Sequence, residues 1–290
     1  MQLTNESKKN TLLAVLAHPD DESFGIGGTL AYYSRHGVNV ELVCATKGEV
    51  GEMEPQFMQE NMTSADVRVN ELRCAAGILG ISKIHFLEYR DSGMSGSIEN
   101  QHPQALCNQP VEKVAHQVAE IIRNVKPDVV ITFDPIGGYR HPDHIAIHHA
   151  TVLAYKLAAD ASVPINQLPA FNSSKLIYST FPKGMMRWMI HLMKLTGKDP
   201  SRFGKNEDID LTSIASVTFP IHYRINYGSV AKERDAAAIC HASQGGGGIS
   251  SGLLGFFRRF LTPYETFMQA QPEFTSKRPL KDLFAGLNGH

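Results

Sequence analysis

Apolar runs and helix-like stretches alternate along the first half of this chain. Short runs rich in aliphatic or β-branched residues predict buried strands at residues 11–17, 38–46, 83–87 and 128–133. The stretches between and after them predict helices at 23–36, 64–80, 110–125 and 143–160. Parallel strands need long crossover connections, usually helical, so this alternation predicts an α/β fold with a mostly parallel sheet covered on both faces.

The second half of the chain has a weaker pattern. It predicts a strand at 175–181, a Met-rich helix at 184–195, a further strand at 211–221 and a helix at 226–242. Four consecutive glycines at 245–248 cannot order a segment by their own propensity, so we expect a loop or hinge there. Because neither an internal repeat nor an interdomain linker is evident, we expect one domain over residues 1–290, with a C-terminal elaboration from about 245.

Histidine and carboxylate side chains occur together in two predicted turns. One reads His18-Pro-Asp-Asp-Glu22 and follows the strand at 11–17; the other reads His141-Pro-Asp-His144 and comes shortly after the strand at 128–133. In open α/β sheets, ligands bind beyond the carboxyl ends of the strands. A catalytic zinc ion needs about three protein ligands and one open position, and His18, Asp21 and His144 would provide two nitrogens and one oxygen.

Other residues of these two turns could accept, donate or direct protons. Zinc lowers the pKa of a bound water to about 7, and Asp20 could then accept its proton. Pro19 restricts His18 to an extended backbone and helps to aim its ring. His141 could stabilise an oxyanion or protonate a leaving amine, while Asp143 could orient either His141 or a ligand imidazole.

Structural explanations for the same residues stay open. A single His-Pro-Asp turn is more often a capped turn than a metal site, because Asp is a favoured N-cap residue. His144 and His148, four residues apart on one helical face, form a rival metal pair. The glycines in Phe24-Gly-Ile-Gly-Gly28 resemble a phosphate-binding turn, but close packing of helix on sheet explains them better than dinucleotide binding.

Composition narrows the class of partner. The chain is 42% hydrophobic and 20% charged, with a formal net charge of −1, so no global field favours nucleic acid or an anionic membrane. The apolar run at 11–17 is too short for a signal peptide or a membrane span. The cysteines Cys44, Cys74, Cys107 and Cys240 are widely scattered without a Cys-x-x-Cys, and three of them lie in apolar or helical patterns, where we expect buried free thiols. We expect a reducing, cytoplasmic location as the default. The oligomeric state stays open, a homo-oligomer included.

Taken together, several motifs give the chain a recognisable likeness. It resembles the LmbE-like / PIG-L family, and the likeness rests on Ala17–Glu22 with Gly27-Gly28, Thr46–Gly51, Arg68-x-x-Glu71, Phe86–Gly93, Tyr139–His144 and His241–Gln244. Members of this family include zinc-dependent deacetylases of N-acetylglucosamine conjugates, such as those of mycothiol, bacillithiol and glycosylphosphatidylinositol synthesis. The resemblance implies a Rossmann-like three-layer α/β/α sandwich, bound Zn²⁺, and a small N-acetylated amino-sugar conjugate as substrate.

The resemblance also implies a role for each matching residue. His18, Asp21 and His144 would be the metal ligands and Asp20 the general base. His141, with Asp143 behind it, and Tyr139 would stabilise the tetrahedral intermediate. Residues expected to contact substrate or to shape its pocket are Arg68, Asp91 and His241.

The expected activity is removal of an N-acetyl group by metal-activated water. One alternative is an amidase for larger N-acyl or thiol conjugates with the same centre, and another is an inactive sugar-binding protein. The residues after the glycine loop match no family motif, and with the segment 184–210 they are expected to set the range of substrates.

Overall fold

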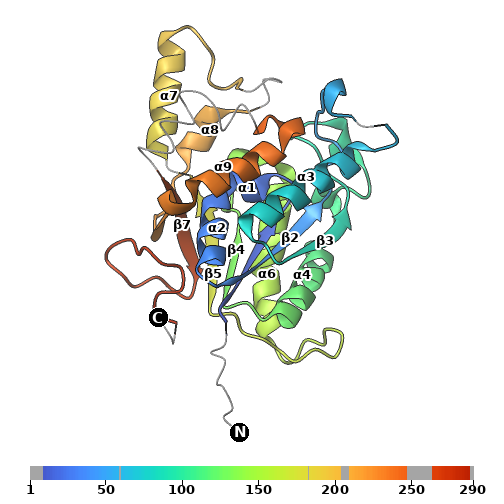
Figure 1. Cartoon of the computed structure of the whole chain (residues 1–290), viewed down its shortest axis with the longest axis vertical. Coiled ribbons are helices and arrows are strands. Elements are labelled where there is room, and N and C mark those ends of the chain that lie inside the picture. Colours follow the sequence, from blue (N-terminus) through green and yellow to red (C-terminus); the bar gives the residue numbers. More distant parts are fainter. Residues whose placement is uncertain (1–8, 59, 182, 204–208, 247–262, 288–290) are drawn as a thin grey trace.

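Seven strands in the described part of the chain form one sheet (Figure 1). The computed structural model describes residues 9–58, 60–181, 183–203, 209–246 and 263–287. The strands lie in the order β3-β2-β1-β4-β5-β7-β6. Their bounds are β1 Thr11–Leu16, β2 Asn39–Thr46, β3 Lys83–Tyr89, β4 Val129–Thr132, β5 Lys175–Thr180, β6 Tyr223–Asn226 and β7 Tyr264–Gln271.

Strands β1 to β5 pair in parallel with one another, and β7 pairs antiparallel with both β5 and β6. Every residue of β1 and β4 is buried, as expected for central strands covered on both faces. The fold class predicted from the alternation of strands and helices is therefore confirmed.

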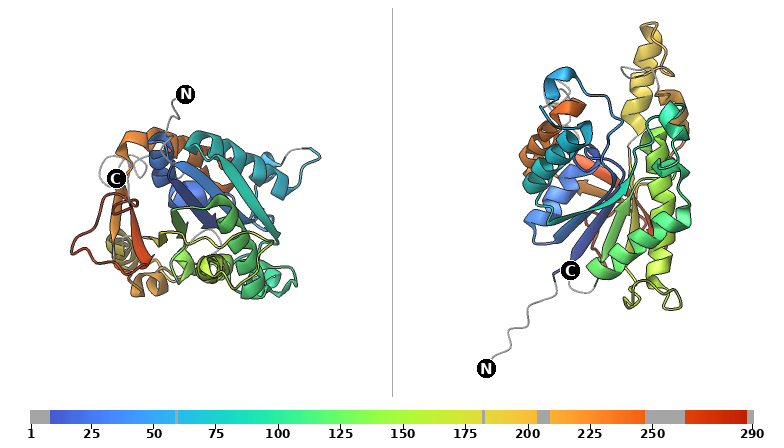
Figure 2. Two further views of the ribbon diagram at one scale, coloured as in Figure 1. Left: turned by 90° about the horizontal axis from the view of Figure 1, so that it is seen from below. Right: turned by 90° about the vertical axis from the view of Figure 1, so that its right-hand side faces the viewer.

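Helices cover the sheet in two layers (Figure 2). On one face α3 and α9 pack together beside α1 and α2, and on the other α4 packs against α6. The helix bounds are α1 Asp21–Gly25, α2 Gly27–Arg35, α3 Ser64–Leu79, α4 Val111–Val125, α5 Gly137–Arg140, α6 Pro142–Ala159, α7 Lys183–Leu195, α8 Leu211–Ser216 and α9 Ala231–Cys240. None of the helices in the described ranges is long and apolar enough to cross a membrane.

Local signals fix several helix ends. Thr63, rather than Ser64, caps α3 in a reciprocal capping box with Asp66, and Gly80 ends the helix in the left-handed conformation. His141 caps α6, because its Nδ1 accepts a hydrogen bond from the backbone N–H of Asp143. That cap places the second histidine turn at the start of a long, buried helix.

Three sequence predictions about elements were wrong. The segment 211–221, predicted as a strand, begins instead with α8, because the Asp210 carboxylate caps the backbone N–H groups of Thr212 and Ser213. The helix predicted at 23–36 is broken at Ile26 into α1 and α2. The predicted helix at 226–242 begins only at Ala231, and the strands β6 and β7 were not predicted.

The expected set of free thiols is also corrected. Cys74 of α3 and Cys240 at the end of α9 form a disulfide, with their Cα atoms 5.9 Å apart. The two residues are 166 positions apart in sequence, so only the packing of α3 on α9 brings them together. Cys44 and Cys107 are free. Of the predicted glycine loop, Gly247 and Gly248 lie outside the described residues.

Candidate metal centre and its cavity

The two histidine turns meet at the carboxyl ends of adjacent strands. His18 follows the last residue of β1 by two positions, and His141 to His144 open α6 after β4. β1 and β4 are paired in parallel, so their carboxyl ends lie at the same edge of the sheet.

The side chains of three residues, His18, Asp21 and His144, form a small triangle between these turns. His18 Nδ1 lies 3.2 Å from His144 Nε2, His144 Nε2 lies 3.2 Å from Asp21 Oδ1, and His18 Nδ1 lies 3.5 Å from Asp21 Oδ2. A tetrahedral zinc ion with ligands at about 2.0–2.1 Å holds them about 3.4 Å apart. The donor set and its spacing therefore fit a zinc-like ion. His141 also lies close enough for the ligand nitrogens of all three histidines to fall within 4.8 Å of one another.

Outer hydrogen bonds orient both imidazoles of this triangle. His144 Nδ1 donates to the Gly137 carbonyl at 3.2 Å, which leaves Nε2 with its lone pair toward Asp21. His18 Nε2 lies 3.1 Å from Asp143 Oδ2, so that Nδ1 is left for the triangle. Metal-binding histidines usually use one ring nitrogen in this way and give the other to a carboxylate or carbonyl.

The contact of Asp143 differs from the one implied by the resemblance. Its carboxylate does not lie behind His141 but accepts from His18 Nε2 and from the Ser92 backbone N–H and hydroxyl. Only its backbone N–H reaches His141, at Nδ1. Of the two orientations that the sequence left open, the structure therefore has Asp143 orienting the imidazole of His18, one of the candidate ligands.

A glycine makes the close approach of the turn after β4 possible. Gly137 has φ +64°, and a Cβ on it would lie only 2.9 Å from the Cβ of His144. A side chain there would push the α5 turn away from His144 and remove the carbonyl that His144 Nδ1 contacts.

Asp20 sits beside the triangle in an unusual backbone conformation. Its φ of +128° lies in a region that non-glycine residues rarely adopt, and strain of this kind concentrates at functional sites. The Arg68 guanidinium lies 3.0 Å from Asp20 Oδ2 and donates to the Pro19 carbonyl at 2.8 Å. Burial raises the pKa of Asp20 to about 6, although Arg68 opposes the shift. A carboxylate with such a pKa is well suited to accept and return a proton near neutral pH.

A buried ion pair lies beneath Asp20. Glu22 Oε2 accepts from the Asp20 backbone N–H at 3.0 Å, and Glu22 Oε1 lies 2.7 Å from His241 Nε2. Burial alone would lower the pKa of His241, but the Glu22 carboxylate raises it. Both side chains are fully buried, so His241 does not line the cavity in which it was expected to meet substrate. The role of Glu22 was missed, because the sequence contains nothing that pairs it with a residue 219 positions away.

The triangle opens into a polar cavity of about 390 Å³. The predicted residues His18, Asp20, Arg68, Asp91, Tyr139 and His141 all line it, with Gly51 and Gln244 among their neighbours. Asp91 Oδ1 lies 3.5 Å from His18 Nε2 and accepts from the Gly93 backbone N–H. Asp91 and Tyr139 therefore lie where a bound molecule would contact them.

A second, more apolar cavity of about 220 Å³ lies on the other side of Asp20 and Tyr139. It reaches Asp21 and His144, and its apolar lining comes from Leu16, Phe24, Ile26, Phe133 and Phe181. The triangle thus has a polar space on one side and an apolar space on the other.

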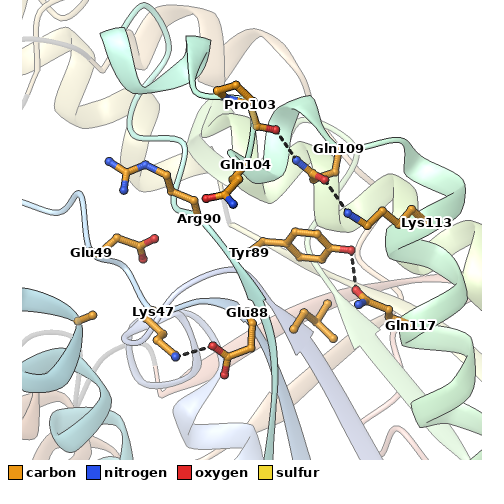
Figure 3. A pocket seen from close by; sticks show the side chains of 12 residues that line it. Lys47, Glu49, Glu88, Tyr89, Arg90, Pro103, Gln104, Gln109, Lys113 and Gln117 are labelled. Carbon is orange, nitrogen blue, oxygen red and sulfur yellow. Dashed lines mark hydrogen bonds and ion pairs between the residues drawn. The ribbon is translucent and has the colours of Figure 1, made fainter.

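A larger cavity, of about 530 Å³, lies along β3 (Figure 3). It is lined mainly by polar side chains that already pair with one another, such as Lys47 with Glu88 and Tyr89 with Gln117. Glu49 lines this cavity and accepts a hydrogen bond, at 3.1 Å, from the backbone N–H of Asp91, which lines the polar cavity. Because none of the triangle residues lines it, we place the candidate active site in the smaller polar cavity.

The rival metal pair has another explanation. His148 Nδ1 donates to the Phe133 carbonyl at 2.8 Å, which makes it a satisfied buried histidine of α6. Only His144 of this pair points into the triangle.

The described residues form an α/β fold with two histidines and one carboxylate gathered at one edge of the sheet. Comparisons with known proteins show the family of the chain. Residues 13–155 match the family described as GlcNAc-PI de-N-acetylase (PIG-L). The chain is similar to 1D-myo-inositol 2-acetamido-2-deoxy-alpha-D-glucopyranoside deacetylases. It is 36% identical to that of Geodermatophilus obscurus over 80% of this chain and 82% of the relative, and 36% identical to that of Acidothermus cellulolyticus over 81% and 79%. The chain belongs to the PIG-L family.

Solved structures extend the likeness at the level of the fold. N,N'-diacetylchitobiose deacetylase from Pyrococcus horikoshii superposes with a TM-score of 0.61 at 21% identity, over 90% of this chain and 84% of that one. GalB, a 4-carboxy-2-hydroxymuconate hydratase from Pseudomonas putida, also gives 0.61, at 19% identity over 93% and 99%. A deacetylase and a hydratase share this fold, so the fold alone does not determine the reaction.

Proposed function

We propose that this protein is a metal-dependent hydrolase that removes the N-acetyl group from an N-acetylglucosamine-type conjugate, with zinc as the metal. The observation that carries the proposal is the triangle of His18, Asp21 and His144 with Asp20 beside it. The named activity of the two bacterial relatives supports this substrate class. The expected cytoplasmic location stays a prediction.

The ligands would be His18 Nδ1, His144 Nε2 and the Asp21 carboxylate. When bound, zinc supplies a Lewis acid for the acetyl carbonyl and lowers the pKa of a water molecule to about 7. Asp20 accepts a proton from the attacking water. Arg68 holds one oxygen of the Asp20 carboxylate in place, and Asp20 lines the polar cavity in which the water would lie. Water adds to the acetyl carbon, and Asp20 returns the accepted proton to the nitrogen as the C–N bond breaks. The second proton of the water passes from the acetic acid to the amine, so that acetate and a protonated amine leave.

His141 and Tyr139 stabilise the charge that develops on the acetyl oxygen. Because His141 Nδ1 accepts from the Asp143 backbone N–H, a neutral His141 carries its proton on Nε2 and can donate it as a hydrogen bond. Burial, with the nearby imidazoles of His18 and His144, lowers the pKa of His141, which favours this neutral form. Partial burial, together with the nearby carboxylates of Asp21 and Asp20, raises the pKa of Tyr139, so its hydroxyl remains a donor.

Asp91 is the side chain best placed to accept a hydrogen bond from a hydroxyl of the substrate, because it lines the polar cavity near His18. Arg68 lines the same cavity, but its guanidinium is already bonded to Pro19, Asp20 and the Gly48 carbonyl. We therefore assign Arg68 mainly to positioning Asp20, and His241 to supporting Asp20 through Glu22.

The apolar cavity favours a second candidate, an amidase for larger N-acyl groups. Its volume of about 220 Å³ is larger than the methyl of an acetyl group needs. Its aromatic lining would suit a longer acyl chain. Rates with N-acetyl, N-butanoyl and N-hexanoyl glucosamine conjugates separate the two activities. A fall in kcat/KM of at least about tenfold with each longer chain supports the deacetylase, and an equal or rising kcat/KM supports the amidase.

The metal requirement has its own test. His18→Ala should lose both bound zinc and turnover, while His148→Asn, a change to the rejected metal pair on α6, should keep both. A His18→Ala variant that retains stoichiometric zinc and wild-type turnover would show that the ligand assignment is wrong.

A further inference from the structure

Helix α7 has apolar side chains on two opposite faces. Its half-buried face carries Met186, Met189, Ile190 and Met193 on the helix that packs against α8. On the other face, Trp188, Leu192 and Leu195 are 66%, 44% and 71% exposed. These three residues are spaced i, i+4 and i+7, so they form one stripe within about 60° of the helix circumference. We call Trp188, Leu192 and Leu195 the α7 stripe.

Cations lie beside the stripe. Arg187 and Lys194 are exposed, and at about 100° per residue both lie roughly 100–120° from Trp188, on the same side of the helix. Lys198 is exposed just beyond the helix, and no acidic residue occurs in the sequence from 183 to 198. The whole chain has a net charge of −1, so this segment is a local concentration of positive charge.

The helix stands out from the body of the molecule next to the candidate site. In Figure 1 and in the right-hand view of Figure 2, α7 projects beyond the rest of the described chain, at the end of the sheet. It begins just after Phe181, which lines the apolar cavity together with Asp21 and His144. The first residues of α7 therefore follow directly from the wall of that cavity.

We propose that α7 docks on the surface of an anionic lipid bilayer. A tryptophan and leucines along one face with Lys and Arg beside them are the composition of helices that lie in the membrane interface. The cations would meet anionic headgroups while the stripe enters the boundary of the acyl chains. A second copy of the chain is a poorer occupant, because α7 packed on α7 would bring like charges together.

A single tryptophan makes the test direct. The sequence contains one tryptophan, Trp188, so tryptophan fluorescence reports on α7 alone. The full chain is titrated with vesicles of phosphatidylcholine containing about 30% phosphatidylglycerol, and separately with pure phosphatidylcholine vesicles. With the anionic vesicles we expect a blue shift of the Trp188 emission and co-sedimentation of the protein. Binding to the neutral vesicles should be at least about tenfold weaker, and in about 0.5 M salt the two affinities should become equal.

Two sets of variants separate the stripe from the cations. Leu192→Ser with Leu195→Ser keeps Trp188 and should weaken vesicle binding at least about tenfold. Arg187→Gln with Lys194→Gln should weaken binding to the anionic vesicles and change binding to the neutral vesicles little. Ile98→Ser, which changes a residue as exposed as Leu195 on another part of the surface, should bind like wild type.

The proposal goes beyond the proposed enzymatic function and can fail separately from it. The stripe variants should keep the wild-type Tm and wild-type hydrolysis of a water-soluble substrate, since no stripe residue lines either cavity of the candidate site. Absence of vesicle binding by the wild type at low salt would overturn the proposal. A blue shift that grows with protein concentration in the absence of lipid would also overturn it, because it would mark the stripe as a contact between copies. So would a loss of vesicle binding in Ile98→Ser equal to that in Leu192→Ser with Leu195→Ser.

Discussion

Arg68 Nη2 lies 3.0 Å from Oδ2 of Asp20 and also donates to the carbonyl of Pro19, so one nitrogen holds both the side chain of the candidate base and the backbone before it. Arg68 belongs to α3, whereas Asp20 precedes α1. The unusual φ of Asp20 is thus supported from another helix. The position of α3 against the sheet therefore controls where the proposed base lies.

Replacing Arg68 with lysine should lower kcat more than it raises KM. Lysine keeps the charge but cannot make the same set of bonds to Pro19, Gly48 and Asp20. Loss of a supporting contact of this kind typically costs about 10–100-fold in activity. Steady-state kinetics on a soluble N-acetylglucosamine conjugate measure the split, with the exposed Arg73→Lys on the same helix as control. A raised KM at unchanged kcat would make Arg68 a substrate-binding residue instead.

Asp143→Asn should weaken metal binding by about 10–100-fold, because its carboxylate orients the His18 ring from behind. Competition with a chromogenic chelator measures the zinc affinity of the variant and of wild type. Ser92→Ala, which removes only one of the bonds to the Asp143 carboxylate, should have a smaller effect. Zinc affinity equal to that of wild type in Asp143→Asn would show that this contact does not tune the site.

His148 should make the fold sensitive to acid. Burial lowers the pKa of its imidazole, so folding favours the neutral form. That contribution is complete above the unfolded pKa of about 6.5 and is lost as the pH falls below it. Tm measured from about pH 8 to about pH 5 should fall more steeply for wild type than for His148→Gln. Identical slopes for the two proteins would contradict this role, whatever their absolute Tm values.

The Cys74–Cys240 disulfide can be tested by counting thiols. Denatured, unreduced protein should have two reactive thiols, those of Cys44 and Cys107, and four after reduction. Cys74→Ser with Cys240→Ser should lower the free energy of unfolding by about 2–4 kcal/mol, and Cys107→Ser should change it little. Four thiols without reduction would mean that the pair is not bonded. Because disulfides are rare in cytosolic proteins, the same count bears on the predicted location.

Much of the candidate site could be predicted from sequence, because its candidate ligands come from two short turns beyond strand ends. The turns around His18 and His141 predicted which edge of the sheet carries the candidate site. The alternation of strands and helices predicted a sheet covered on both faces. The partners of those residues could not be predicted in the same way. Glu22 and His241 are 219 positions apart, and the contact of Asp143 with His18 rather than His141 depends on how α6 is set against β1.

The errors in the second half of the chain have related causes. A short segment of mixed apolar and hydroxyl residues such as 211–216 suits a helix as well as a strand, and the Asp210 cap favours the helix. β7 comes from the C-terminal region, which matched no motif, yet it lies between β5 and β6 in the sheet. Pairing between segments so far apart leaves no local signal, because the partner strand is chosen by tertiary packing.

The most direct test of the account measures acetate release and zinc content on the same samples of wild type and Asp20→Asn. The substrate is 1-O-substituted N-acetylglucosamine, and zinc is determined on the protein used for kinetics. We expect acetate release by wild type, a fall in kcat of at least about 100-fold in Asp20→Asn, and an unchanged zinc stoichiometry, since removing a general base typically lowers the rate about 10²–10⁴-fold. Wild-type turnover in zinc-loaded Asp20→Asn would contradict the assignment of Asp20 as the base. Zinc-loaded wild type that releases no acetate from any such conjugate would contradict the deacetylase itself.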